Sequence, residues 1–270
     1  GNITISVNST LSSAGTVDVD GSRTLTLSGI ISGSGGALTK TGAGTLALSG
    51  TNTFNQGTLI SAGTLAISAD SNLGTGSLTL NGGTLNTTGT FTSSKAIVMN
   101  DAGTISTDGS TTFTQDGVIS GTGGALTKSG TGTLVLAGTN TFDQGVSLAQ
   151  GTLTVDNDSA LGDGGQLSFT GGTLNAGSNH TISNNATLST SATVDVDSGV
   201  TLTLSGVVGG SGGAFSKTSD GTLALSGVNT YTTGTQLSGG VIRVANNAAL
   251  GTGTLTFNGG SLNAANDFTI

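Results

Sequence analysis

The sequence predicts an all-β protein that folds as a solenoid, in which short strands stack coil upon coil. Three observations predict this fold class. A long segment recurs at a nearly fixed spacing, glycine is abundant (49 of 270 residues) while proline is absent, and apolar residues alternate with small polar ones. Alternation over short runs is typical of half-buried β-strands. A fixed period along the whole chain is typical of a stacked array.

The recurring segment begins with two glycines and ends with an asparagine, a threonine and an aromatic residue. Its copies are GGALTKTGAGTLALSGTNTF at 35–54, GGALTKSGTGTLVLAGTNTF at 123–142 and GGAFSKTSDGTLALSGVNTY at 212–231, at offsets of 88 and 89 residues. We therefore expect one continuous solenoid over 1–270, built from three superrepeats (1–88, 89–177 and 178–264) and the start of a fourth at 265–270.

Within the first superrepeat, four short runs have the alternation of strands. They are TLTLS at 24–28, TLALS at 45–49, TLAIS at 64–68 and SLTLN at 77–81. Four coils to a superrepeat give about 22 residues per coil and about 12 coils in all, stacked in parallel. The alternation points one set of apolar side chains into the core: Leu25, Leu27, Leu46, Leu48, Leu65, Ile67, Leu78 and Leu80.

Composition excludes several classes of function. The formal net charge is −8, all 14 acidic residues are aspartates, and only 7% of residues are charged. Such a surface disfavours nucleic acid and anionic lipid as partners. Cysteine is absent, so neither a disulfide nor a thiolate metal site can form. Because the chain starts out of step with the repeat and ends in Asp267-Phe268-Thr269-Ile270, we expect it to be a segment of a longer array.

The run GGALTKTGAGTLALSGTNTFNQGTLISAGTLAIS at 35–68, with its counterparts at 123–155 and 212–244, closely resembles the autotransporter-associated β-strand repeat, also called the passenger-associated transport repeat. The third copy departs from the pattern at Phe215, Ser219-Asp220 and Val241-Ile242. The resemblance implies a right-handed β-helical stalk in an extracellular or surface-displayed bacterial protein. It also implies an outer-membrane translocator barrel outside this segment. The family brings no catalytic residues and no cofactor.

Two pairs of aspartates are the candidates for metal binding. Asp18 and Asp20 alternate with valines in the first superrepeat, and Asp195 and Asp197 do the same in the third. Carboxylates on one strand face are suited to a weak Ca²⁺ site, and their spacing approaches that of a glycosidase acid/base pair. The alternative is a solvated ladder without a ligand, and we expect this one because no sugar-binding aromatic accompanies the pairs.

Other polar residues predict structural roles. Lys40, Lys128 and Lys217 are expected to form a sparse row of solvated charges, and His180, the only histidine, is expected at the surface. An asparagine at a corner and an aromatic plugging the coil beside it are expected in each copy: Asn52 with Phe54, Asn140 with Phe142, and Asn229 with Tyr231. Gln115 replaces a leucine of the other copies, so it predicts either a local bulge that turns it outward or a soft point.

These observations favour a non-enzymatic stalk or adhesin segment whose glycan or cell-surface ligand is unidentified. One alternative is a β-helix enzyme that acts on polysaccharide, since fold does not decide function. Another is a self-assembling filament or an ice-binding or surface-binding array. Both ends of the chain look strand-like and lack lysine or proline, so we also expect head-to-tail association.

Overall fold

The computed structural model describes residues 1–265. They divide into two compact units, one of residues 1–134 with 141–143 and one of residues 135–140 with 144–265. Each unit is a parallel β-solenoid, and every strand pairing found in residues 1–265 is parallel. The all-β parallel solenoid is thus confirmed. The right-handed coil and the single continuous domain of three superrepeats stay predictions, and Asp267, Phe268, Thr269 and Ile270 lie outside the described residues.

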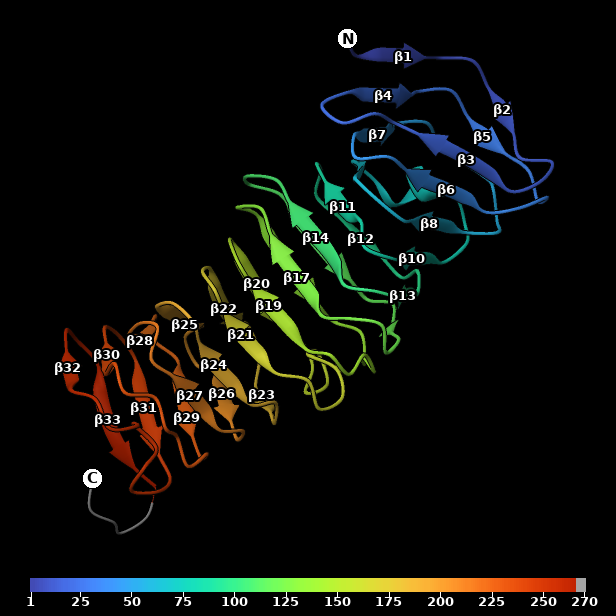
Figure 1. Ribbon diagram of the computed structural model, residues 1–270. Helices are drawn as coiled ribbons and strands as arrows, with labels where there is room; N and C mark the ends of the chain where they lie inside the picture. The colour runs from blue at the N-terminus through green and yellow to red at the C-terminus, as the bar shows by residue number, and fades with distance from the viewer. Residues whose placement is uncertain (266–270) are drawn as a thin grey trace. The chain divides into compact units, whose positions relative to one another are not determined.

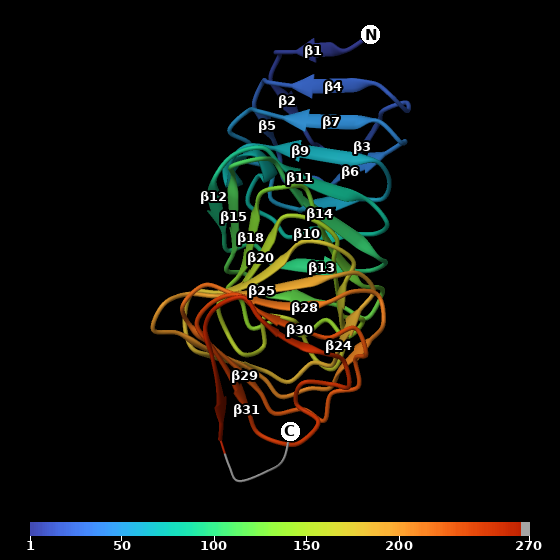
Figure 2. The ribbon, with the colours of Figure 1, turned by 90° about the vertical axis from the view of Figure 1, so that its left-hand side faces the viewer.

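Unit 1 has three faces, and the strands of one face stack in ladders (Figures 1 and 2). The first sheet contains β1 (Ile3–Ile5), β4 (Thr24–Leu27), β7 (Thr45–Leu48), β9 (Thr64–Ile67), β11 (Thr84–Thr87), β14 (Gly103–Thr107) and β17 (Leu126–Ser129). The second contains β3 (Gly15–Asp18), β6 (Leu38–Thr41), β8 (Thr58–Ile60), β10 (Leu78–Leu80), β13 (Ile97–Met99) and β16 (Ile119–Ser120). The third face carries β2 (Ser9–Thr10) with β5 (Ile31–Ser32), and β12 (Phe91–Ser93) with β15 (Thr112–Gln115).

Unit 2 is built in the same way, and β18 (Thr133–Leu136) contains the boundary between the units. One sheet contains β19 (Val146–Leu148), β21 (Leu167–Phe169), β24 (Ala186–Leu188) and β27 (Val208–Gly210). Another contains β20 (Thr152–Val155), β22 (Thr173–Ala176), β25 (Ala192–Val196), β28 (Phe215–Thr218), β30 (Thr235–Leu237) and β32 (Leu255–Phe257). The last contains β23 (His180–Ile182), β26 (Thr201–Leu204), β29 (Thr222–Leu225), β31 (Val241–Val244) and β33 (Ser261–Ala264).

The core follows the predicted alternation. Leu46, Leu65 and Leu85 stack in register on successive coils, and each is fully buried. Leu25 and Leu27 belong to the first coils, where every residue of β4 is only half-buried. Within residues 1–265 the one helical segment is a 3-10 turn at Asp70–Leu73. A continuous stack of aliphatic side chains therefore replaces the central core of a globular domain.

The coils vary in length and are on average slightly shorter than the predicted 22 residues. Register partners are 19 residues apart at Leu46 and Leu65, 20 apart at Leu65 and Leu85, and 23 apart at Ile105 and Lys128. The chain makes about 13 turns instead of the 12 expected. The sequence could not give this count because the turns between strands differ in length and carry no alternation of their own.

Short coils have a consequence for the repeat. Each coil has three faces, and each face carries either a strand or a corner without a strand. From β6 to β17 the chain passes through eleven strands and two such corners, at 51–54 and 70–73. One superrepeat is therefore four coils and a third. Matching strands of copies 1 and 2, β6 and β17, lie in different sheets of unit 1. Matching strands of copies 2 and 3, β19 and β30, lie in different sheets of unit 2. Each copy thus advances by one face.

Candidate functional site

The three lysines of the repeat are buried, so the prediction of a solvated row is wrong. Lys40, Lys128 and Lys217 are each 0% exposed and lie inward in the strands β6, β17 and β28. Their aliphatic stems extend the columns of apolar side chains, as in the register of Val17, Lys40 and Ile60. A row of lysines is also excluded in unit 1 because β6 and β17, which carry Lys40 and Lys128, lie in different sheets. Sequence contained the signal, since Lys40 follows buried Leu38 by two residues.

Backbone carbonyls at the next corner receive each ammonium group. The Nζ of Lys40 donates to the carbonyl of Gly42 at 2.7 Å, that of Lys128 to Gly130 at 2.9 Å, and that of Lys217 to Ser219 at 2.7 Å. Burial lowers the pKa of Lys128 to about 8. It also lowers the pKa of Lys40 and Lys217, against the opposing charges of Asp18 and Asp195 respectively. These lysines secure corners and offer no surface charge.

The asparagine of each copy is buried at a corner where the sheet is interrupted. Asn52, Asn140 and Asn229 are 4%, 0% and 3% exposed, and the aromatic two residues on (Phe54, Phe142 or Tyr231) is 0% exposed in each case. The Oδ1 of Asn229 accepts from the backbone N–H of Val208 at 2.8 Å, and its Nδ2 donates to the carbonyl of Ala249 at 2.6 Å. The side chain thus replaces missing ladder bonds on both neighbouring coils.

The aspartate pairs contact neutral side chains of adjacent coils. Asp18 accepts from the Thr41 hydroxyl at 2.8 Å, Asp195 from the Thr218 hydroxyl at 2.9 Å, and Asp197 from the Asn175 amide at 3.1 Å. Asp20 is exposed. Among residues 1–265, no group of three or more histidines, cysteines or acidic residues could hold a metal ion. The weak Ca²⁺ sites at Asp18, Asp20, Asp195 and Asp197 stay a prediction.

Gln115 points inward, so the expected outward turn is wrong. Its side chain is 1% exposed, and its Nε2 donates to the carbonyls of Lys95 at 2.7 Å and Gly117 at 3.0 Å. Its Oε1 is buried without a hydrogen-bond partner, as is the hydroxyl of Thr107. Gln115 and Lys95 line an enclosed hollow in the interior of unit 1. The middle copy therefore carries a polar defect in its core.

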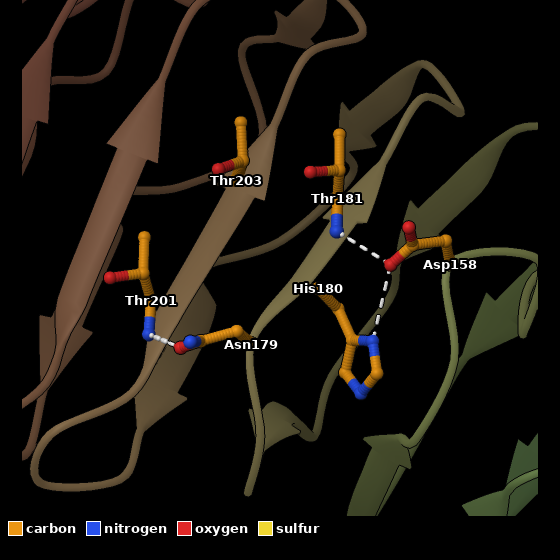
Figure 3. Close-up of a pocket in the computed structure, with 6 residues that line it drawn as sticks. All are labelled: Asp158, Asn179, His180, Thr181, Thr201 and Thr203. Carbon is orange, nitrogen blue, oxygen red and sulfur yellow. Dashed lines mark hydrogen bonds and ion pairs between the residues drawn. The ribbon is translucent and has the colours of Figure 1, made fainter.

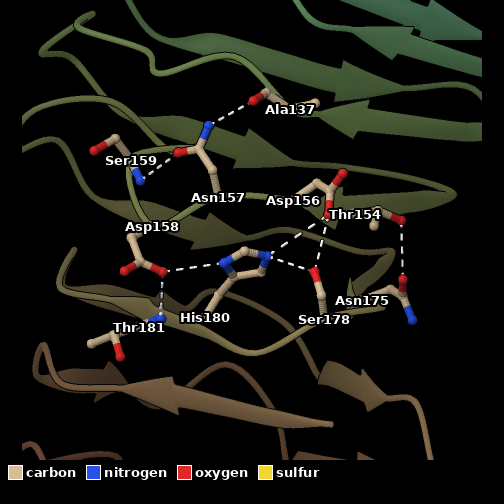
Figure 4. Close-up of polar contacts among 10 residues, drawn as sticks. All are labelled: Ala137, Thr154, Asp156, Asn157, Asp158, Ser159, Asn175, Ser178, His180 and Thr181. Atoms are coloured by element: carbon tan, nitrogen blue, oxygen red, sulfur yellow. Dashed lines mark hydrogen bonds and ion pairs between the residues drawn. The ribbon is translucent and has the colours of Figure 1, made fainter.

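A polar network around His180 joins two consecutive coils of unit 2 (Figure 4). The Nδ1 of His180 lies 3.1 Å from Asp158 Oδ1, and its Nε2 lies 2.8 Å from the hydroxyl of Ser178. That hydroxyl also donates to Asp156 Oδ1 at 3.1 Å. His180 occupies an inward register position as the partner of Leu202, but its imidazole is 12% exposed and lines two open hollows, so the prediction of a surface histidine holds only in part. The sequence signal was its position two residues before buried Ile182.

The network resembles a catalytic triad in its distances but is built as a clamp. A triad needs a hydroxyl that donates to the imidazole and faces a substrate. The hydroxyl of Ser178 lies within hydrogen-bonding distance of both Asp156 and His180, and neither hollow beside His180 has Ser178 in its lining. The imidazole thus connects Asp158 of one coil to Ser178 of the next, and Ser178 in turn contacts Asp156.

Asp158 also continues the ladder at the point where its sheet is interrupted. Its Oδ1 accepts from the backbone N–H of Thr181 at 2.9 Å, which with His180 lowers the pKa of the carboxyl group. One coil further on, Asn179 Oδ1 accepts from the N–H of Thr201 at 2.7 Å. These residues line an open hollow with His180 and Thr203 (Figure 3).

With this geometry established, the chain can be compared with known proteins. A parallel β-solenoid whose repeated polar residues are buried is a structural array. Residues 38–67, 126–155 and 215–244 match the family described as Passenger-associated-transport-repeat. The resemblance predicted from the sequence is confirmed for these three segments.

One curated relative is the "Adhesin BmaC autotransporter" of Brucella suis biovar 1 (strain 1330), which is 44% identical over 143 residues. The match covers 52% of this chain and 4% of the relative, so the chain spans a small part of that protein. No solved structure matches. Among the described residues, no helix is long and apolar enough to cross a membrane.

Proposed function

We propose that this chain is a non-enzymatic stalk segment of a bacterial autotransporter adhesin, displayed outside the outer membrane. The observation that carries the proposal is the direction of the repeated polar residues. The lysine and asparagine of all three copies are buried and bonded to the chain's own backbone. The repeat therefore specifies coil geometry and leaves no recurrent group on the surface to act on a substrate.

The related adhesin supports the location. That relative is named as an adhesin and an autotransporter. By analogy, a translocator barrel outside this chain would anchor it to the cell. Export in an unfolded form suits a fold whose contacts connect neighbouring coils, because each coil can add to the one before it.

A display experiment tests the proposal. The 270-residue chain is placed between an N-terminal epitope and an autotransporter translocator, and the epitope is measured on intact cells with antibody. We expect surface display, and we expect a chain with Asn52→Ala, Asn140→Ala and Asn229→Ala to lose it and to become protease-sensitive. Equal display and equal protease resistance of both chains would contradict a role for the repeat in the stalk.

The alternative of a polysaccharide-acting enzyme is tested on the same purified chain. Soluble and insoluble polysaccharides are incubated with it, and new reducing ends are counted. We expect none above buffer. Turnover that disappears in the His180→Gln variant would overturn the non-enzymatic proposal, because it would assign the His180 network a chemical role.

A further inference from the structure

Three hollows of unit 2 lie in a row on the outside of one face. The first is lined by Thr139, Asn157, Asp158, Ser159, Asn179 and His180. The second shares Asp158, Asn179 and His180 with it and extends to Thr203. The third begins at Thr203 and reaches Ala224 and Arg243. We call this row the trough. It crosses successive coils at roughly 4.8 Å per coil.

The floor of the trough is a register column of mostly small side chains. Thr181 pairs with Thr203, Thr203 with Ala224, and Ala224 with Arg243 on consecutive strands of the sheet β23-β26-β29-β31. Threonine and alanine leave the backbone open to close approach, and the hydroxyls can both donate and accept hydrogen bonds. Such a floor suits an extended, hydrophilic chain that lies along the coils.

Two side chains at one end of the trough are fixed in complementary roles. Asp158 and Asn179 each use Oδ1 to accept a backbone N–H of the following coil. Within residues 1–265, Asp158 Oδ2 and Asn179 Nδ2 have no hydrogen-bond partner, and the Asp158 side chain is 67% exposed. An acceptor and a donor are thus held on adjacent coils, on either side of His180 (Figure 3), without the entropy loss of ordering them on binding.

The charges around the trough select against ionic ligands. Asp156 is 52% exposed beside Asp158, whereas Arg243 at the far end is the one lysine or arginine among the described residues of the lining. Elsewhere the lysines of the repeat are buried, so the surface repels polyanions more than the formal charge suggests. Within residues 1–265, no phenylalanine or tyrosine lines the three hollows, so these residues offer an apolar ligand little to pack against.

We propose that the trough binds an uncharged, hydroxyl-rich glycan strand, with Asp158 and Asn179 hydrogen-bonding neighbouring hydroxyl or amide groups. The role of such a site in attachment rests on the proposed function as an adhesin segment. A single strand without an aromatic platform gives an affinity in the millimolar range, or about −4 kcal/mol. Many copies of the glycan on a surface would raise it by avidity.

Matched linear hexasaccharides test the trough on the whole 270-residue chain by NMR titration. The probes are N-acetylchitohexaose, which is neutral, its deacetylated cationic form, and an anionic oligogalacturonate. We expect the neutral probe to shift the amide signals of Thr181, Thr201 and Thr203, and the anionic probe to shift none. Absence of any shift with the neutral probe at 10 mM would overturn the proposal, as would equal binding of the anionic one.

Variants then locate the site. Asn179→Asp keeps the Oδ1 acceptor for Thr201 and removes the free donor, so we expect at least a fivefold loss of affinity for the neutral probe. Asn185→Asp is the control, because Asn185 accepts from Val207 N at 2.8 Å in the same way outside the trough. It should change affinity less than twofold. Equal losses of affinity in the Asn179→Asp and Asn185→Asp variants would place binding outside the trough and overturn the proposal. Display of the chain on cells would still support its function as a stalk.

Discussion

Two corners of the repeat differ in how strictly the three copies keep the same polar residue. At the first corner every copy keeps a buried asparagine, namely Asn52, Asn140 and Asn229. At the second corner, the first copy has Asp70 bonded to Lys95, and the second has Asp158 bonded to His180. The third copy has Asn247 there. The Asp158 side chain is 67% exposed, against 34% for Asp70.

The difference shows where the fold constrains the sequence. An inward asparagine satisfies backbone groups on two coils that water cannot reach, so only a side chain with one donor and one acceptor fits. An outward carboxylate needs only some donor on the next coil, and lysine, histidine or a backbone N–H supplies one. The inward corner asparagine therefore repeats in every copy, whereas the outward position is free to acquire separate roles.

The largest expected effect is at the buried corner. Asn229→Ala leaves the N–H of Val208 and the carbonyl of Ala249 buried without partners, so we expect a loss of about 2–5 kcal/mol in the free energy of unfolding. Urea denaturation measures it. Asn185→Ala, which removes one bond at an exposed corner, should cost about 1 kcal/mol or less. Equal losses would break the comparison between inner and outer corners.

The two outer corners should differ from each other. Lys95→Met leaves the Asp70 carboxylate unpaired, with an Oδ1 that is already buried and unpartnered, so we expect a cost of about 1–3 kcal/mol. His180→Phe should cost less than about 1 kcal/mol because Asp158 remains solvated. Adding Asp70→Asn to Lys95→Met should recover part of the loss. A larger loss of stability for His180→Phe than for Lys95→Met would contradict this difference between the two corners.

The buried lysines predict a pH dependence. Lys128 has a pKa of about 8 in the fold and about 10.5 when unfolded, so the unfolded chain binds more protons between these values. Stability should then rise with pH, by about 1–2 kcal/mol after allowance for solvent screening. Denaturation at pH 7.5 and 9.5 avoids titrating Tyr231, whose pKa burial raises to about 12. Lys128→Met should reduce the rise, and a fall in stability over this interval would contradict the account.

The smallest effect is at a turn that differs between copies. Gly42 and Gly130 have φ of 70°, and the matching residue of the third copy is Ser219 with φ of 59°. Glycine adopts this conformation without the steric cost that serine bears. Ser219→Gly should therefore raise the thermal midpoint slightly, corresponding to about 0.5–1 kcal/mol. Gly42→Ser should lower it by more, because a Cβ added at Gly42 would clash with the carbonyl oxygen of Val19. Opposite signs in calorimetry would contradict this.

The strands and the inward leucines could be predicted because apolar residues such as Leu46 and Leu48 recur at every second position. The parallel stacking could be predicted from the repeat. The same rule, applied to Lys40 and His180, would have placed both inward; the assumption that charged residues are solvated overrode it. The pairing of Asp158 with His180 could not be predicted from the sequence. It depends on a coil length that varies from 19 to 23 residues with the turns.

The central claim is that short coils advance each copy by one face, and disulfide formation tests it most directly because the chain has no cysteine. Ala47 and Ala66 are register partners on β7 and β9 and point outward, 19 residues apart. The account predicts that Ala47→Cys with Ala66→Cys closes a disulfide under mild oxidation, whereas Ala47→Cys with Ala69→Cys, at the spacing of a 22-residue coil, does not. Cross-linking of the second pair and not the first would contradict it.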